Sequence, residues 1–146
     1  YMNNQPIITL FHGSPHNIDD KLKPSKPRGN NEFQKMKAVF ATDLEKVAQI
    51  YAITRDKKRE RKGWFVHEDK LHIRKPYTLN KKGYVYIFST RTYITDPTNN
   101  PNQYAMTRSI TPKYKYLVKP EDIKDNIIEY ESKKEFNKMA DKLIPL

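Results

Sequence analysis

The sequence predicts an α+β fold in a single domain that covers residues 1–146. Most of its regular segments have the short apolar or alternating pattern of strands, and only two have the spacing of helices. Their order is strand, loop, strand, helix and then mostly strands, rather than the strict alternation that builds a parallel sheet. A chain of 146 residues can bury one hydrophobic core without needing disulfides or a structural metal. We therefore expect a small twisted sheet that is split around a cleft.

The predicted strands follow from local patterns and their stop signals. Residues 84–88 carry the strongest strand pattern, and residues 81–83 form the turn before them. Residues 17–34 and 96–101 are polar and hold several prolines, so we expect loops there. The predicted strands are residues 7–11, 38–41, 64–66, 71–73, 84–88, 104–110, 114–118 and 125–130.

Two segments are predicted to be helices with an apolar face. Residues 44–52 repeat apolar side chains at helical spacing, and either residue of the pair 42–43 can cap the first turn. Residues 132–143 show the same periodicity near the end of the chain, where Ser132 and Glu135 form a capping-box pattern.

The chain is strongly basic, with 28 Lys and Arg against 17 Asp and Glu and a formal net charge of +11. Such a surplus favours an anionic partner, namely nucleic acid, a dinucleotide or an acidic protein surface. A solvated lysine-rich surface with no specific partner would explain the same net charge. Residues 55–62 concentrate six basic and two acidic side chains, so we expect an exposed helix end or loop there.

Several classes of protein are disfavoured. Cysteine is absent, which excludes disulfides and thiolate metal sites and fits a reducing compartment. The first residues lack the pattern of a secretory signal, and no apolar run is long enough to cross a bilayer. The four histidines are not spaced as a metal set, and no phosphate loop or serine elbow is present. We expect a cytoplasmic monomer that needs no metal.

Three distant segments fit one site together, at residues 10–15, 38–43 and 102–106. In the first, His12-Gly13-Ser14 follows a predicted strand. Glycine at a strand end lets a ring system approach the backbone, while histidine and serine can hydrogen-bond ribose hydroxyls. A plain turn is the competing interpretation of these three residues.

In this order the segments resemble the NAD-binding signature of the ADP-ribosyltransferases, in the branch of diphtheria toxin and the poly(ADP-ribose) polymerases. The spacing from Ala41 to Ala48 is that of the family, and Asn102-Gln103-Tyr104 resembles its Asn-Glu-Tyr. A further Lys-Tyr-Leu match lies at residues 115–117. Two departures are Val39 and Val47, which stand where the family has a tyrosine and a serine around nicotinamide.

The resemblance implies an ADP-ribosyltransferase-like split sheet around a cleft that holds NAD as substrate, in a small domain of prokaryotic or phage type. The residues that it places against NAD are His12, Gly13, Ser14, Phe40 and Tyr51. Tyr51 lies one residue beyond the family's aromatic position, and packing in the core is its alternative role.

Arg28 is a further candidate, because a guanidinium suits the paired oxygens of a pyrophosphate. Ordinary solvation of the loop is the alternative for this side chain.

The catalytic candidates are His12 and Gln103, and Gln103 stands where the family has its glutamate. A glutamine can still bond a ribose hydroxyl, but it supplies no negative charge to an oxocarbenium-like state and cannot act as a base. Losing such a charge raises the activation free energy of the reaction by about 3 kcal/mol or more. We expect the strands that end at His12 and start at Gln103 to lie side by side, with His12, Ser14 and Gln103 converging. On this basis Gln103→Glu should raise NAD hydrolysis.

Three explanations for the glutamine stay open. The protein binds NAD or ADP-ribose without reacting, it is a slow transferase that uses another acid such as Glu32, or the register is displaced and Glu129 or Glu131 serves instead.

Two functions remain. The first is an NAD-binding ADP-ribosyltransferase-like protein that either transfers ADP-ribose to a macromolecular acceptor or has weak or lost catalysis. The alternative is a non-catalytic basic module that binds nucleic acid or an acidic protein, through residues 55–62 beside Trp64 and the Tyr/Lys alternation of residues 113–116.

Overall fold

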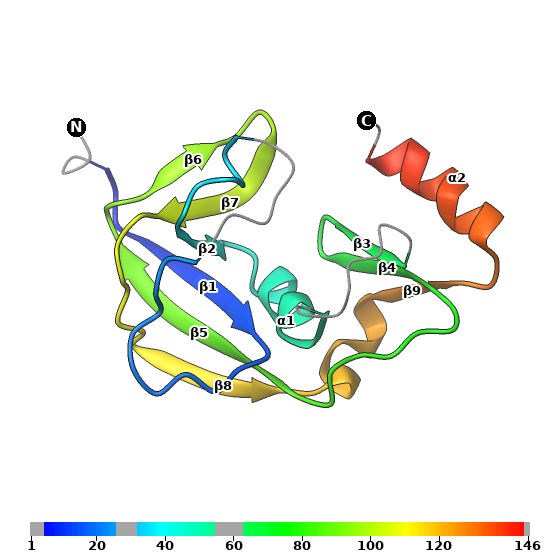
Figure 1. The fold of residues 1–146 in the computed structure, drawn as a ribbon, viewed down its shortest axis with the longest axis horizontal. Helices are drawn as coiled ribbons and strands as arrows, with labels where there is room; N and C mark the ends of the chain where they lie inside the picture. The colour runs from blue at the N-terminus through cyan, green and yellow to red at the C-terminus, as the bar shows by residue number, and fades with distance from the viewer. Residues whose placement is uncertain (1–4, 26–31, 55–62, 145–146) are drawn as a thin grey trace.

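The computed structural model describes residues 5–25, 32–54 and 63–144, and the described chain has an α+β fold with two sheets and three helices (Figure 1). The elements in order are β1 (Ile8–Ser14), β2 (Val39–Thr42), α1 (Glu45–Thr54), β3 (Trp64–His67), β4 (Lys70–Arg74), β5 (Gly83–Thr90), β6 (Ile94–Asp96), β7 (Asn100–Met106), β8 (Tyr114–Val118), the 3-10 helix η2 (Pro120–Asn126), β9 (Ile127–Tyr130) and α2 (Lys133–Leu143).

The larger sheet has six antiparallel strands in the order β6-β7-β2-β1-β5-β8. The smaller sheet has the order β3-β4-β9, in which β9 runs parallel to β4. Helix α1 lies between the two sheets, as Figure 1 shows. Its residues Ile50 and Ile53 share one buried cluster with Val85 of β5 and with Leu71 and Ile73 of β4. This cluster joins the two sheets.

The two faces of the larger sheet are covered by different parts of the chain. One face, here called the helix face, carries Phe11 and packs on α1. The opposite face, here called the loop face, carries Leu10 and Tyr86 and is covered by residues 15–25 after β1. Leu22 in that loop is buried, and its backbone exchanges two hydrogen bonds with Ile110. Both faces are therefore buried at the centre of the sheet.

Helix α1 packs closely because two glycines face it. A Cβ atom added to Gly13 would lie 2.0 Å from the carbonyl oxygen of Ala48, and one added to Gly83 would lie 2.1 Å from that of Ala52. Neither distance is possible for a real Cβ atom, so only glycine permits this approach of helix and sheet.

The smaller sheet has its own aromatic core beneath α2. His72 is buried, its ring stacks on Phe65 with centroids 4.6 Å apart, and its Nδ1 atom lies 2.8 Å from the Tyr130 hydroxyl. Phe136 of α2 packs on Phe65 and Tyr130. The helix begins as expected, because the Ser132 hydroxyl accepts a hydrogen bond from the amide of residue 135.

The expected α+β class and most expected elements are confirmed. The strand expected at 7–11 is too short, because β1 continues to Ser14, and His12-Gly13-Ser14 lies within the strand instead of following it. The loop expected at 96–101 is also wrong. Residues Asn100 and Pro101 belong to β7, and only residues 97–99 form the turn from β6. The pairing of β6 with β7 is irregular there, and such a bulge tolerates a proline that cannot donate to the ladder. The strand expected at 104–110 ends at Met106, and η2 precedes the last strand.

None of the described helices is long and apolar enough to span a membrane.

Candidate functional site

The structure brings the three segments of the family resemblance onto neighbouring strands. Residues 10–14 lie on β1, residues 39–42 form β2, and residues 102–106 lie on β7, in the spatial order β1, β2, β7. The expectation that β1 and β7 are direct neighbours is wrong, because β2 pairs with both. Segments separated by tens of residues in sequence are therefore two strands apart at most.

His12 lies where β1 and β2 separate. These strands share one register pair, Phe11 with Thr42, and the next residue of β1 is His12. Its Nδ1 atom lies 2.6 Å from the carbonyl oxygen of Phe40. Because a carbonyl oxygen only accepts, Nδ1 carries the proton, and a neutral ring then has Nε2 as its acceptor. The imidazole thus links β1 to β2 beside the last register pair of the two strands.

The register places Gln103 on the other face of the sheet. Gln103 is paired with Thr42, and Thr42 with Phe11, so these three side chains share the helix face. His12 follows Phe11 and points to the loop face, where its ring packs on Tyr86 with centroids 6.3 Å apart. The expected convergence of His12, Ser14 and Gln103 is therefore wrong.

The partner of Gln103 agrees with this placement. Its Oε1 atom accepts a hydrogen bond of 3.4 Å from Nε2 of Gln34. Gln34 lies in the turn before β2, next to Phe33, which packs edge-on against Phe40 with centroids 5.7 Å apart. Glu32 is an exposed residue of the same turn.

The other residues expected to contact NAD have partners within the protein. Gly13 faces Ala48 of α1, so its small size is explained by helix packing. The Ser14 hydroxyl is buried and accepts a hydrogen bond of 3.1 Å from the amide of His16. Tyr51 packs edge-on against Trp64 with centroids 6.4 Å apart. Arg28 lies outside the described residues.

Glu129 and Glu131 lie at the smaller sheet, away from the three segments on β1, β2 and β7. Glu129 belongs to β9 of the smaller sheet, and its carboxylate accepts a hydrogen bond from Tyr77 and faces Lys75 at 3.7 Å. Lys75 also pairs with Glu131 at 3.1 Å. Burial, with the hydrogen bond to Glu129 as a second cause, raises the pKa of Tyr77 to about 12. These carboxylates thus form a separate surface cluster.

Asp43 is a carboxylate that the sequence suggested only as a helix cap. Its two oxygens accept hydrogen bonds from Asn102 Nδ2 at 3.0 Å and from the Tyr104 hydroxyl at 3.1 Å. Asn102 has a φ of 64°, which asparagine tolerates better than most residues. Burial, and next the nearby charge of Asp43, raise the pKa of Tyr104. Asp43 therefore anchors the irregular start of β7 on β2, and the sequence holds no local signal for this role.

A hollow of about 590 Å³ opens beyond the end of β1, and the sequence did not predict it. It is lined by Pro15, His16, Thr78, Leu79, Asn80, Lys81 and Lys82. We call it the Lys81–Lys82 hollow. Among the described residues no group of three or more His, Asp or Glu is arranged to hold a metal ion.

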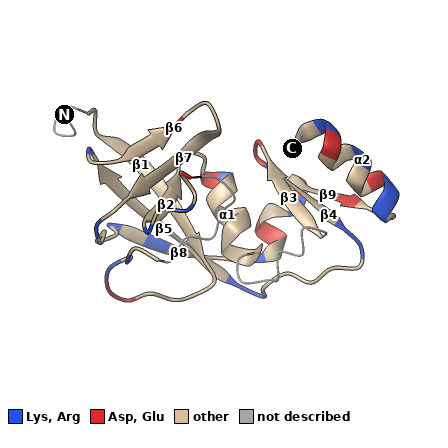
Figure 2. Ribbon diagram, turned by 45° about the horizontal axis from the view of Figure 1, so that its top comes forward, with Lys and Arg blue, Asp and Glu red and all other residues tan. Residues whose placement is uncertain are grey.

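The surfaces expected for a basic binding module are only partly available. Residues 55–62 lie outside the described residues. Tyr114 is 62% exposed, but Tyr116 donates a hydrogen bond of 2.6 Å to Glu45 and Lys115 pairs with Asp19 at 2.9 Å. Figure 2 shows lysine and arginine spread over both sheets and α2. Within the alternating run, Lys113 and Tyr114 are exposed and Lys113 lies over the Tyr114 ring, while Lys115 and Tyr116 are engaged by acidic side chains.

Comparisons with protein families, with curated proteins and with solved structures give no match for this chain.

Proposed function

We propose that this protein binds NAD or ADP-ribose as an ADP-ribosyltransferase-like domain whose transfer reaction is weak or lost. The observation that supports this most is the strand order, which sets the three segments of the resemblance on β1, β2 and β7. A likeness confined to sequence would not require these segments to be neighbours. The opening of β1 from β2 at His12 fits the split sheet of that family.

His12 is the residue that we expect to contact the nucleotide. The bond from Nδ1 to the Phe40 carbonyl holds the ring in one orientation, so little rotamer freedom is lost on binding. An imidazole held in this way suits a hydrogen bond with a ribose hydroxyl. The adenosine ribose or the nicotinamide ribose could supply that hydroxyl.

Two features argue against efficient transfer. Gln103 is neutral, so it cannot stabilise the positive charge that develops on the ribose. It also lies on the helix face, whereas His12 points to the loop face, so the two side chains do not act on one ribose from the same side. The binding half of the site is thus separate from the position of the family's catalytic glutamate.

Calorimetric titration of the protein with NAD, ADP-ribose and nicotinamide tests the proposal. We expect His12→Ala to weaken NAD binding about tenfold, because one net hydrogen bond of about 1.4 kcal/mol is removed. His67→Ala, on β3 of the other sheet, is the matched control and should bind NAD as the wild type does. Circular dichroism would confirm that both variants are folded.

Either of two results would overturn the proposal. One is wild-type protein that takes up neither NAD nor ADP-ribose at millimolar concentration. The other is NAD binding that responds equally to His12→Ala and His67→Ala.

A further inference from the structure

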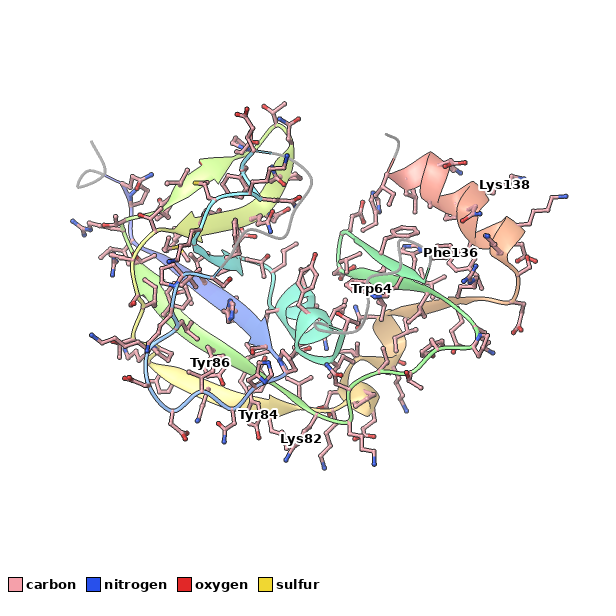
Figure 3. The ribbon with its side chains drawn as sticks, in the orientation of Figure 1. Trp64, Lys82, Tyr84, Tyr86, Phe136 and Lys138 are labelled. Carbon is pink, nitrogen blue, oxygen red and sulfur yellow. The ribbon has the colours of Figure 1, made fainter. Side chains whose placement is uncertain are left out.

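The Lys81–Lys82 hollow is formed by two segments that the larger sheet brings together. Pro15 and His16 continue directly from β1, and residues 78–82 lead directly into β5. Ser14 and Tyr84 are register partners, so the two segments leave the same end of the sheet side by side. Figure 3 shows Lys82 and Tyr84 close together at this end.

The lining has the chemistry of an anion site. Among the described residues, the lining of the hollow contains Lys81 and Lys82, the possible donors His16, Thr78 and Asn80, and no carboxylate. Lysine binds phosphate as a point charge, while neutral donors add directed hydrogen bonds. The hollow has a volume of about 590 Å³ and is open to solvent.

The backbone around the hollow is held in place on both sides. The His16 amide donates to the Ser14 hydroxyl at 3.1 Å, and the His16 carbonyl accepts from the Tyr86 hydroxyl at 2.6 Å. On the other side the Asn80 amide donates to the carbonyl of Ile53 at the end of α1, at 2.8 Å. Walls that are ordered before binding lower the entropy cost of taking up a ligand.

A second hollow offers a useful contrast. It has a volume of about 260 Å³, and its lining includes Asp19, Asp20, Lys113 and Lys115. Its Lys115 is already bound to Asn17 and Asp19, at 2.6 and 2.9 Å. A phosphate there would meet two carboxylates, whereas the described lining of the Lys81–Lys82 hollow holds none.

We propose that the Lys81–Lys82 hollow binds the pyrophosphate group of a small phosphorylated ligand, in the class of nucleoside diphosphates. Lys81 and Lys82 neutralise the charge, and His16, Thr78 and Asn80 bond the phosphate oxygens. The site is distinct from the opening at His12, and it does not depend on NAD binding.

Titration calorimetry with inorganic pyrophosphate and with ADP tests this site. The double variant Lys81→Glu with Lys82→Glu should lose at least about tenfold in affinity for both probes, because two charge-assisted contacts become repulsive. The control is Lys133→Glu with Lys138→Glu on α2, which has the same net charge. Figure 3 shows Lys138 at the upper right of the molecule, well away from Lys82 at the bottom. The control should stay within about twofold of the wild type, as expected for distant surface charges screened by salt.

Three results would overturn the proposal. They are no saturable binding of pyrophosphate or ADP by the wild type, equal losses in both double variants, and binding of a single-stranded oligonucleotide but neither small probe. His12→Ala separates this inference from the proposed function, because it should leave pyrophosphate binding unchanged. If NAD fails to bind while pyrophosphate binds and depends on Lys81 and Lys82, only the proposed function fails.

Discussion

Gly13→Ala distinguishes packing from ligand approach as the reason for the glycine in the His-Gly-Ser motif. The added Cβ atom would lie 2.0 Å from the Ala48 carbonyl oxygen and 2.9 Å from the Ala52 nitrogen, both backbone atoms of α1. Ordinary contact begins at 3.4 Å, so α1 would have to move away by the difference, about 1.4 Å. Backbone cannot rotate aside as a side chain can. The substitution must therefore loosen α1 from β1.

The expected loss is about 3 kcal/mol in the free energy of unfolding, at the upper end of the usual cost of overpacking. For a chain of this length that loss lowers the melting temperature by roughly 6–12 °C. Urea unfolding followed by circular dichroism measures it. Thr9→Ala is the control, at an exposed position of the same strand where the hydroxyl lies 3.2 Å from that of Ser89, and it should change stability by about 1 kcal/mol or less.

A Gly13→Ala protein with the unfolding midpoint of the Thr9→Ala protein would refute the packing argument. If that stable variant also lost NAD binding, the glycine would be needed for a ligand and not for α1.

Two further predictions concern His72 and Gln103. Burial, with the nearby His67 as a lesser cause, lowers the pKa of His72 from its usual 6.5, so below about pH 6.5 the unfolded chain takes up a proton that the folded chain resists. The urea concentration at the unfolding midpoint should therefore decrease as the pH is lowered from 7.5 to 5.5, and it should decrease more in the wild type than in His72→Phe. Equal decreases in the two proteins would contradict this. For Gln103, the resemblance alone predicts faster nicotinamide release in Gln103→Glu, whereas the register predicts a rate within about twofold of the wild type. A rise of tenfold or more that His12→Ala abolishes would restore the expected convergence.

Local patterns in the sequence were sufficient for most of the fold. The alternating run of β8 was predicted with its observed bounds, and the start of α2 was predicted from Ser132 and residue 135. Such elements depend on neighbours within a few residues, which a single sequence displays. Where the strand depends on a distant partner the prediction failed, as at Asn100 and Pro101, which pair through an irregular hairpin.

The candidate site was predicted in part for the same reason. The sequence determined which three segments carry the resemblance, and the fold set them on adjacent strands. The reason for a glycine at position 13 followed only from the tertiary structure, because Ala48, which it packs against, belongs to a helix more than thirty residues away in sequence. The walls of the Lys81–Lys82 hollow likewise meet only because β1 pairs with β5.

The faces of His12 and Gln103 were also decided by tertiary structure alone. Side chains alternate along a strand, so a shift of one residue in pairing moves a side chain to the opposite face. The motif around Gln103 is the same in either register. Only the pairs Phe11 with Thr42 and Thr42 with Gln103 determine that Gln103 lies on the helix face while His12 lies on the loop face. Register is a property of strand partners, which one strand's sequence does not contain.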